Sequence, residues 1–449
     1  MTVAARLRTD PHMTHRHTSV AGPPARGDTA RTFDPGAYER ALDGLTGRRD
    51  EMVATVQAWS AINSGTGNLD GLAAMDRQVV DAFGRLNAEL TPIDLPDGQA
   101  VGADGALQPV RYGRMLRFSK RPDAPRRVLL TGHTDTVFPA DHPFQTPRWL
   151  DDATLNGPGV ADMKGGIIVM LHALDALERS GLAEGLGWEV LLSPDEETGS
   201  LGSGPVLAER ARTAHIGMTY EPALSDGTLA GARKGSGNFT VVVRGRAAHA
   251  GRAFDHGRNA VAALARFIAG LDALNGQRPG VTFNAAKVSG GTAPNIVPDL
   301  ALCRFNIRVG TAEDQRWATD QVAALVAEVA GGDGLTAELH GQFNRPPKPL
   351  TPANRALFQA VEMCGRALGI PVAFKPTGGC CEGNNLAAAG LPNVDTLGVR
   401  GGAIHSAEEF VLVDSFVERA RLSALMLLAL ADGALDDVLG LRARGVAGS

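Results

Sequence analysis

Two adjacent glutamates, Glu196 and Glu197, offer the clearest chemistry in this sequence of 449 residues. They follow the apolar run 188–192, and the Ser-Pro dipeptide and the glycine around them predict that a buried strand ends here in a turn. Consecutive side chains that leave a strand point in different directions, so one carboxylate can bind a metal ion while the other reaches a water molecule beside it. Two acids alone are more often part of a solvated loop, so this interpretation depends on other motifs.

His133 and Asp135 form a second motif at the end of an expected strand. The strand is predicted at 127–131, and side chains two residues apart on extended backbone share one face. On that face the carboxylate can accept the second imidazole N–H of a histidine that binds a metal ion. A capped strand end would give the same pattern, but the carboxyl ends of strands are where α/β sheets place their sites.

More acids and another imidazole occupy similar positions. Glu221 follows a strand expected at 216–220, and His405 follows one expected at 394–397. Asp162 lies among glycines before an expected helix, where the backbone can approach a ligand closely, although a helix N-cap is the other interpretation. Carboxylates and imidazoles gathered at one sheet edge form a site for a borderline divalent ion such as zinc.

The elements that must position these residues form an α/β pattern that is interrupted by a different one. The α/β segments comprise helices at 35–62, 69–90, 167–179, 204–212, 353–368 and 413–430, and strands at 115–119, 127–131, 188–192, 216–220, 372–375 and 394–397. The interruption comprises strands at 239–243, 281–288, 300–309 and 335–339 and helices at 259–274 and 312–329. Its order is β-α-β-β-α-β, which is ferredoxin-like. We therefore expect a discontinuous α/β domain at 35–232 and 346–432 with an inserted α+β domain at 233–345.

The composition indicates a soluble protein that acts on small molecules. Hydrophobic residues make up 44% of the chain and charged residues 21%, and the length suggests two or three domains. A net charge of −5 gives no reason to expect a nucleic-acid partner, and no apolar run predicts a membrane span. The four cysteines lack disulfide or zinc-finger spacing, which favours a cytoplasmic location. Residues 1–34 are expected to be a disordered tail, and 433–449 a C-terminal tail.

These motifs together resemble those of a known enzyme family. In chain order they are Gly-His133-x-Asp135-x-Val, Gly-x-x-Asp162-x-Lys-Gly-Gly, Asp-Glu196-Glu197-x-Gly, Glu221-Pro, His249-Ala-Gly and His405-Ser. The set resembles the co-catalytic zinc amidohydrolases and metallopeptidases that include aminoacylase, acetylornithine deacetylase, succinyl-diaminopimelate desuccinylase and the glutamate carboxypeptidases. The resemblance implies an α/β catalytic domain of the zinc-peptidase type, with a mixed central sheet flanked by helices. It also implies that the ferredoxin-like insertion is a lid that serves dimerisation.

By this resemblance, the chain would bind two divalent metal ions, zinc or else cobalt or manganese. Asp162 would bridge the two ions. His133 and Glu221 would complete the first site. Glu197 and His405 would complete the second.

Other residues would act beside the ions. Glu196, which is left without a metal ion, would take the proton of the attacking water and return it to the leaving amine. Asp135 would orient His133 from behind. His249 would reach the active site of a partner subunit and steady the developing oxyanion, which implies a homodimer formed through the lid.

The likeness is strongest to the glutamate carboxypeptidase branch. Asn295, Arg308 and Arg345 resemble positions of that branch's lid, and we add Gly379 to this expected substrate-binding set. A guanidinium fork can hold a carboxylate with two parallel hydrogen bonds. At Cys380-Cys381-Glu382 the chain departs from its relatives, which usually have a small hydroxyl residue and an aspartate, so the local shape of the pocket is not predicted.

The expected function is hydrolysis of an amide bond next to a free carboxylate, as in a glutamate-carboxypeptidase-like exopeptidase. The substrate would be a small N-acyl amino acid or a peptide-like molecule. A deacylase of N-acyl amino acids, of the acetylornithine deacetylase or aminoacylase type, is the alternative, because it shares the same features. A metal-binding or small-molecule-binding protein without activity is an alternative of another class.

Overall fold

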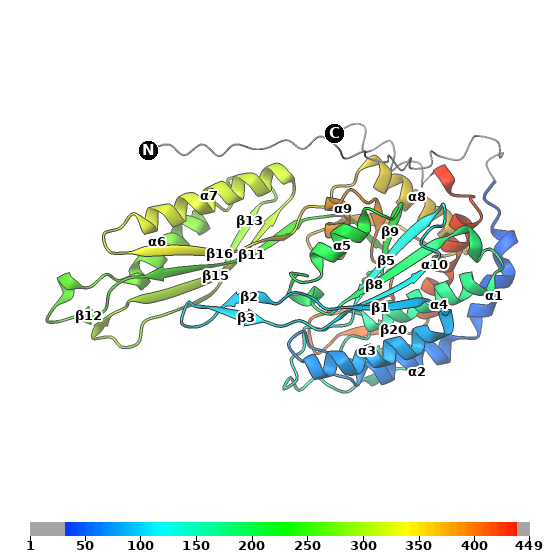
Figure 1. Cartoon of the computed structure of the whole chain (residues 1–449), viewed down its shortest axis with the longest axis horizontal. Coiled ribbons are helices and arrows are strands. Elements are labelled where there is room, and N and C mark those ends of the chain that lie inside the picture. Colours follow the sequence, from blue (N-terminus) through cyan, green and yellow to red (C-terminus); the bar gives the residue numbers. More distant parts are fainter. Residues whose placement is uncertain (1–31, 438–449) are drawn as a thin grey trace, which may run out of the picture.

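The computed structural model describes residues 32–437 of the chain. It has two parts that follow one another along the longest axis (Figure 1). We call the wide part, built on a mixed sheet, the main body, and the narrow part, residues 235–345, the insert. The tails expected at 1–34 and 433–449 lie mostly outside the described residues.

The main body is built on a sheet that has six strands within the described residues. Its central strands run parallel, and two antiparallel strands extend it at one edge. The order is β1 (Glu89–Ile93), β4 (Met115–Lys120), β8 (Gly187–Ser193), β5 (Arg127–His133), β9 (Ile216–Thr219) and β18 (Asn393–Val394). Parallel strands are buried on both faces, which is why β5 and β8 are nearly continuous apolar runs. The mixed central sheet that the sequence predicts is confirmed.

Helices cover both faces of this sheet. Leu130 and Val190 point to the larger hydrophobic cluster, whereas Leu129 and Leu191 point to a smaller one on the other face. The larger cluster is covered by α1 (Glu39–Thr46), α2 (Arg49–Ser60), α3 (Leu69–Phe83), α4 (Lys164–Arg179), α8 (Pro352–Ala367) and α10 (Ser415–Ala431), and the smaller one by α5 (Gly204–Ala211) and α9 (Glu382–Ala388). No helix within residues 32–437 is both long and apolar enough to cross a bilayer.

Two predicted helices are wrong in extent. The helix expected at 35–62 is divided into a 3-10 turn, α1 and α2, because Gly47 ends α1. The helix expected at 69–90 ends at Phe83, and Asn87, with a left-handed φ of 49°, turns the chain into β1. Helical apolar spacing alone could not show these breaks, because buried apolar side chains continue on both sides of them.

Three further predictions in the C-terminal part need correction. The strand expected at 372–375 is β17 (Phe374–Thr377), since its parallel pairing with β10 (Leu229–Arg233) sets the register. The strand expected at 394–397 stops at Val394, because Thr396 has a φ of 62°. Helix α9, which the sequence did not predict, begins within the glycine-rich stretch 378–385, and Cys381 caps its N-terminus.

The insert has the expected ferredoxin-like fold. Its antiparallel sheet has the order β13, β15, β11 and β16, and its two long helices pack on one face around Phe267 and Phe305. The bounds are β11 (Gly235–Arg244), α6 (Ala260–Ala273), β13 (Thr282–Gly290), β15 (Leu300–Val309), α7 (Ala312–Ala330) and β16 (Thr336–Arg345). The insert has a sheet and a hydrophobic core separate from those of the main body. The domain boundaries at 232/233 and 345/346 stay predictions.

The chain crosses between the two parts at two adjacent segments. Arg233 and Lys348 exchange backbone hydrogen bonds of 2.9 and 3.0 Å, so the outgoing and returning segments run side by side. Both side chains are buried and bind Asp395 of the main body, Arg233 through Nε and Nη2 at 2.9 and 3.0 Å and Lys348 through Nζ at 2.7 Å. We call these two crossing segments the root of the insert; a buried ionic cluster of Arg233, Lys348 and Asp395 fixes them to the main body.

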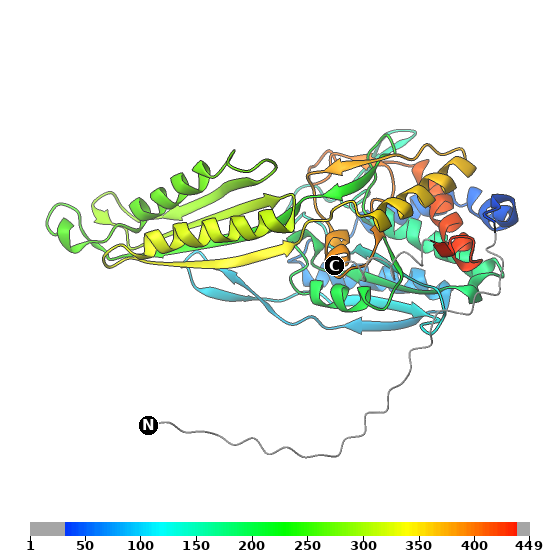
Figure 2. The same ribbon diagram turned by 90° about the horizontal axis from the view of Figure 1, so that it is seen from above.

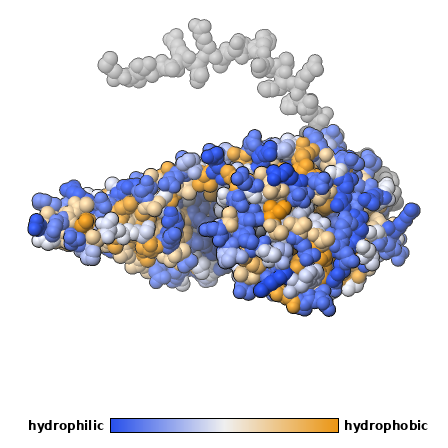
Figure 3. Space-filling model, turned by 90° about the horizontal axis from the view of Figure 1, so that it is seen from below, coloured by the Kyte–Doolittle hydropathy of each residue, from blue (hydrophilic) through white to orange (hydrophobic). Residues whose placement is uncertain are grey.

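A hairpin arm makes a further connection between the two parts. It consists of β2 (Gly98–Val101) and β3 (Leu107–Val110), and it runs from the main body along the insert sheet (Figures 1 and 2). Val101 packs on Val242 and Leu302, on the sheet face away from α6 and α7, and accepts a 2.6 Å hydrogen bond from Arg304 at its carbonyl. Figure 3, which views the molecule from below, shows a hollow between the insert and the main body.

Candidate metal centre

Two groups of possible ligands lie next to each other within the described residues, and they share Asp162. In the first group, His133 Nε2 lies 3.2 Å from Asp162 Oδ1 and 3.8 Å from Glu221 Oε1. In the second, His405 Nε2 lies 3.2 Å from Asp162 Oδ2 and 3.3 Å from Glu197 Oε2. Asp162 thus offers one oxygen to each group. The structure brings all five predicted ligands together, and their role as ligands stays a proposal.

The parallel core of the main sheet explains why these residues meet. β5 lies between β8 and β9, with His133 opposite Ser193 and Thr131 opposite Thr219. The carboxyl ends of the three strands therefore lie at one edge, where Glu197 and Glu221 follow β8 and β9. Asp162 and His405 are carried to the same edge by loops. These loops are joined through β7 (Thr154–Asn156) and β20 (Phe410–Leu412), which pair antiparallel.

Asp135 lies beneath the centre and contacts both halves of it. It is fully buried, its carboxylate lies 3.3 Å from His133 Nδ1, and its carbonyl oxygen lies 3.0 Å from the same nitrogen. The carboxylate also accepts the backbone N–H groups of Glu196 and Glu197 at 3.1 Å each, and the hydroxyl of Thr66 at 2.7 Å. It is therefore placed to orient His133, as expected, and also the turn that carries both glutamates. The link to Thr66 and to the glutamate turn was not predicted.

Burial and mutual charge shift the pKa values of the side chains in the two groups. Burial and the charge of Asp162 raise the pKa of Glu197 to about 8, and the same causes raise the pKa of Glu221 well above its ordinary value. Hydrogen bonds to Asp162 and Glu197 raise the pKa of His405 to about 11. The pKa of His133 is also raised, because Asp135 and Asp162 outweigh the burial that would lower it.

The donor set fits divalent cations. Carboxylates that crowd together in this way repel one another when ionised, and bound cations would offset that repulsion. Glu221 Oε1 is buried and has no hydrogen-bond partner within the described residues, so one lone pair of this carboxylate remains for a ligand. Three carboxylates and two imidazoles are ligand types that suit zinc and similar ions.

Glu196 belongs to neither ligand group. Its carboxylate Oε1 and its carbonyl oxygen accept hydrogen bonds from Arg345 Nη2 at 2.7 and 3.1 Å, and Arg345 Nη1 donates to Asn385 Oδ1 at 2.6 Å. Arg345 is 2% exposed and lies where β16 returns to the main body. The guanidinium predicted to bind a substrate carboxylate is therefore paired with Glu196 in this structure.

The remaining predicted residues lie in the insert or at its root. Arg308 on β15 donates to Asn306 Oδ1 at 2.9 Å and to Cys380 Sγ at 3.2 Å, beside the exposed Gly379. His249 and Asn295 are exposed neighbours, since β12 (Ala248–His249) pairs with β14 (Ile296–Val297) and Ala250 N–H donates to Asn295 O at 2.9 Å. Figure 1 shows β12 at the far end of the insert. Within one chain, the structure does not bring these two residues to the metal centre.

Several buried polar residues around the centre were not predicted. Lys164 Nζ donates to the carbonyls of Trp59 and Ile62 at 3.1 and 2.8 Å, and Glu409 binds the loop of Asp162. Glu382 is fully buried next to the Arg345 side chain, and burial raises its pKa to about 8. Lys164 stands in the motif of Asp162, and Glu382 stands in the stretch where the chain departs from its relatives. A single sequence does not distinguish buried acids such as Glu382 and Glu409 from solvated ones.

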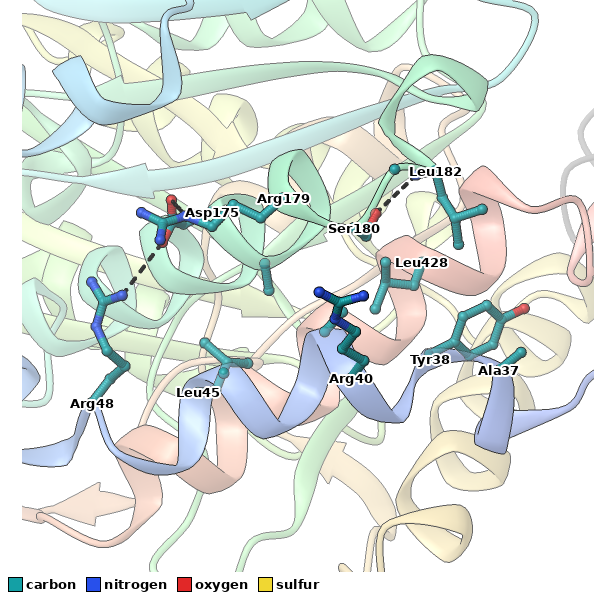
Figure 4. Close-up of a pocket in the computed structure, with 14 residues that line it drawn as sticks. Ala37, Tyr38, Arg40, Leu45, Arg48, Asp175, Arg179, Ser180, Leu182 and Leu428 are labelled. Atoms are coloured by element: carbon teal, nitrogen blue, oxygen red, sulfur yellow. Dashed lines mark hydrogen bonds and ion pairs between the residues drawn. The ribbon is translucent and has the colours of Figure 1, made fainter.

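A cavity of ≈530 Å³ lies elsewhere, between α1, the end of α4 and α10 (Figure 4). Arg40, Arg48 and Arg179 contribute cations to its wall. Asp175 accepts a hydrogen bond from Arg179 at 2.9 Å and lies 3.7 Å from Arg48. No candidate metal ligand lines this cavity, so it is separate from the centre.

Comparisons with known proteins agree with the geometry of the centre. The model of the peptidase family M20/M25/M40 matches residues 129–429. Carboxypeptidase G2 of Pseudomonas sp. (strain RS-16) is 26% identical over 398 residues, which cover 87% of this chain and 92% of that protein. Succinyl-diaminopimelate desuccinylase of Bordetella petrii is 29% identical over 314 residues, or 65% of this chain and 80% of the relative.

Solved structures show the same fold. A metallo-carboxypeptidase of the M20 family from Sulfolobus solfataricus superimposes with a TM-score of 0.66 at 14% identity, covering 85% of this chain and all (100%) of that one. A dinuclear metal-binding peptidase of the M20 family from Bacillus subtilis superimposes with a TM-score of 0.59 at 15% identity, covering 86% and 98%.

Proposed function

This chain belongs to peptidase family M20/M25/M40, and from that membership we propose that it uses two divalent metal ions to hydrolyse an amide bond next to a free carboxylate. The observation that carries the proposal is Asp162, whose two oxygens serve two adjacent groups of ligands. His133 and Glu221 would hold one ion with it. Glu197 and His405 would hold the other.

The chemistry follows from this centre. When bound, two divalent ions would supply a Lewis acid for the amide carbonyl and would lower the pKa of a bound water molecule. Glu196, next to the ligand Glu197 and outside both groups, would accept the proton of that water and pass it to the leaving nitrogen. Asp135 supports this arrangement, because it binds the backbone of both glutamates and faces His133.

We propose a substrate with a free carboxylate, as in a glutamate-carboxypeptidase-like exopeptidase. Arg308 and Gly379 lie together where the insert meets the main body, and Arg345 lies at the same root. A deacylase of N-acyl amino acids is the second candidate, because a desuccinylase is among the similar proteins. The two differ only in the side of the amide that is recognised.

We also propose that the active site is shared between two chains. His249 and Asn295 lie together at the far end of the insert, so they could serve a metal centre only in another copy of the chain. A homodimer formed through the insert would bring them there.

We also propose a cytosolic location. It is supported by the four cysteines, all in the described part of the chain, which are free.

Replacing Glu196 tests the mechanism. Glu196→Gln removes the base and keeps its shape, so kcat should fall by roughly 10²–10⁴-fold while the chain still binds two ions. Glu197→Gln is the matched control and should lose metal. Activity would be screened by mass spectrometry against N-acyl amino acids, dipeptides and pteroyl-glutamate-type amides, with metal measured by elemental analysis.

Three outcomes would contradict the proposal. Loss of metal in Glu196→Gln would mean that the roles of the two glutamates are exchanged. Full activity in the presence of a strong chelator would exclude a metal-dependent mechanism. A zinc-loaded chain that hydrolyses no member of the panel would favour the binding protein without activity.

A further inference from the structure

Glu409 carries a buried carboxylate that binds the loop of Asp162. The residue is 1% exposed, and its carboxylate accepts the backbone N–H groups of Gly159 at 3.1 Å and of Ala161 and Asp162 at 3.0 Å each. Hydrogen bonds from backbone N–H groups to an ionised carboxylate are stronger than those between neutral groups, and several together hold both partners in one geometry. One of the three bonds is to Asp162 itself, so the carboxylate fixes the backbone of the ligand and not only the loop beside it.

Glu409 also belongs to the loop that carries His405. It stands at the end of that loop, just before β20, and its carbonyl oxygen accepts Asn156 Nδ2 at 2.7 Å and the Gly157 N–H at 3.2 Å. Side chain and main chain of this one residue therefore join the two loops that bring Asp162 and His405 to the sheet edge.

A brace that only strengthens the fold would use the same bonds. The position of Glu409 distinguishes such a brace from a residue that positions the metal ligands. Asp162 is the residue that the two ligand groups have in common, and His405 belongs to the second group. Because Glu409 binds the backbone N–H of Asp162 and stands in the loop of His405, a displacement of its carboxylate would change the geometry of both groups at once.

Resting on the proposed function, we propose that Glu409 is a positioning residue for the metal centre. It holds Asp162 so that one carboxylate oxygen faces each ligand group, and it fixes the distance between Asp162 and His405. Groups that orient metal ligands from behind typically change metal affinity by about 10–100-fold when they are replaced.

The hydrogen bonds define the variant. One oxygen of Glu409 accepts two N–H groups and the other accepts the Gly159 N–H. In Glu409→Gln the amide oxygen can keep the first two bonds, but the amide NH₂ then faces the Gly159 N–H, donor against donor. The neighbouring Glu408 is exposed, so Glu408→Gln is a matched control with the same change of charge one residue away.

The experiment measures metal binding without substrate. Wild type, Glu409→Gln, Glu408→Gln and Glu221→Gln are freed of metal, and Co²⁺ is titrated into each while the visible absorption and a competing chelator report both binding steps. Glu409→Gln should weaken both steps by about 10–100-fold and alter the cobalt spectrum. Glu221→Gln, which removes a ligand of one group, should weaken one step. Glu408→Gln should match wild type.

Wild-type affinity and spectrum in a folded Glu409→Gln would overturn the inference. So would a lower Tm with unchanged metal affinity, because that is the result of a brace alone. If Glu409→Gln does not fold, Glu409→Asp decides instead: it keeps the charge but is one methylene shorter, so both steps should still weaken, and unchanged affinity would refute the inference. A wild-type chain that binds no divalent ion would refute the proposed function first, before any variant of Glu409 is measured.

Discussion

Replacing Asp395 by asparagine should strongly destabilise the protein. Asp395 is fully buried and binds two buried cations, Arg233 and Lys348, through three hydrogen bonds of 2.7–3.0 Å. Asparagine has nearly the same shape but no charge, and its NH₂ group would face a cation. Two buried cations would then be left with one amide oxygen between them.

The size of the effect follows from these contacts. Removing one partner of a buried ion pair costs about 3–5 kcal/mol, because the other charge stays buried without compensation. The ammonium of Lys348 keeps its position 5.9 Å from the ring of Phe358, which offsets only about 1 kcal/mol. We therefore expect a loss of about 4 kcal/mol. For a body of this size it corresponds to a fall in Tm of roughly 6–7 °C.

The pH dependence gives a second test. Burial alone would raise the pKa of Asp395, but Arg233 and Lys348 outweigh it, so the pKa lies below the ordinary value. A lowered carboxyl pKa contributes stability that is present above the unfolded pKa of about 3.9 and is lost as the pH falls through the lower folded value. The difference between wild type and Asp395→Asn should therefore be constant down to about pH 5 and should shrink at more acid pH.

Urea and thermal unfolding, followed by tryptophan fluorescence, measure both effects. Trp317 lies in the insert and Trp59, Trp149 and Trp188 lie in the main body, so a background with Trp317→Phe reports on the main body, and its difference from the parent signal reports on the insert. Asp152→Asn, at an exposed aspartate, is the control and should change stability by less than about 0.5 kcal/mol. A loss below about 1 kcal/mol in Asp395→Asn, or a difference that grows at acid pH, would refute the idea that the ionic cluster stabilises the root of the insert.

Three other experiments test the site. Arg345→Lys should raise KM for a substrate with a free carboxylate more than for its amide; equal effects on the two, with a lower kcat, would instead assign Arg345 to holding Glu196. Glu196→Ala and His249→Ala should each be nearly inactive, and mixing them with subunit exchange should restore about a quarter of wild-type activity, whereas a fully active monomer would exclude a shared site. Removal of metal by a chelator should lower the free energy of unfolding by about 2.7 kcal/mol for each ion that was present at about 100 times its Kd, and an unchanged Tm would show that the centre binds no ion tightly.

The sequence predicted which side chains gather at the sheet edge better than it predicted their surroundings, and their role as metal ligands stays a proposal. His133, Glu197 and Glu221 could be placed because each follows an apolar strand, and parallel neighbours end at one edge of a sheet. The insert could be predicted because its strands and helices alternate in a known order. Both arguments use local patterns that a single sequence displays.

What the sequence could not predict depends on contacts between distant segments. The pairing of Arg345 with Glu196 joins two parts of the chain through a side chain that could equally point to solvent. The hairpin arm consists of short, mostly exposed strands without an apolar pattern, and only the insert surface beneath it gives it a place. Glu408 and Glu409 are identical adjacent residues, so the sequence does not show which of them is buried. Only the contacts with the loop of Asp162 distinguish Glu409.

The position of helix α10 has a consequence for how the protein is made. This helix is among the last described elements of the chain, yet it packs against α4 inside the core of the main body (Figure 1). The first half of the main body therefore leaves the ribosome while the face of α4 that packs on α10 is still uncovered. The insert, whose segments are contiguous, can complete its fold on the ribosome before the domain that surrounds it in the sequence. Until synthesis passes residue 431, the nascent main body has an open core that chaperones can bind.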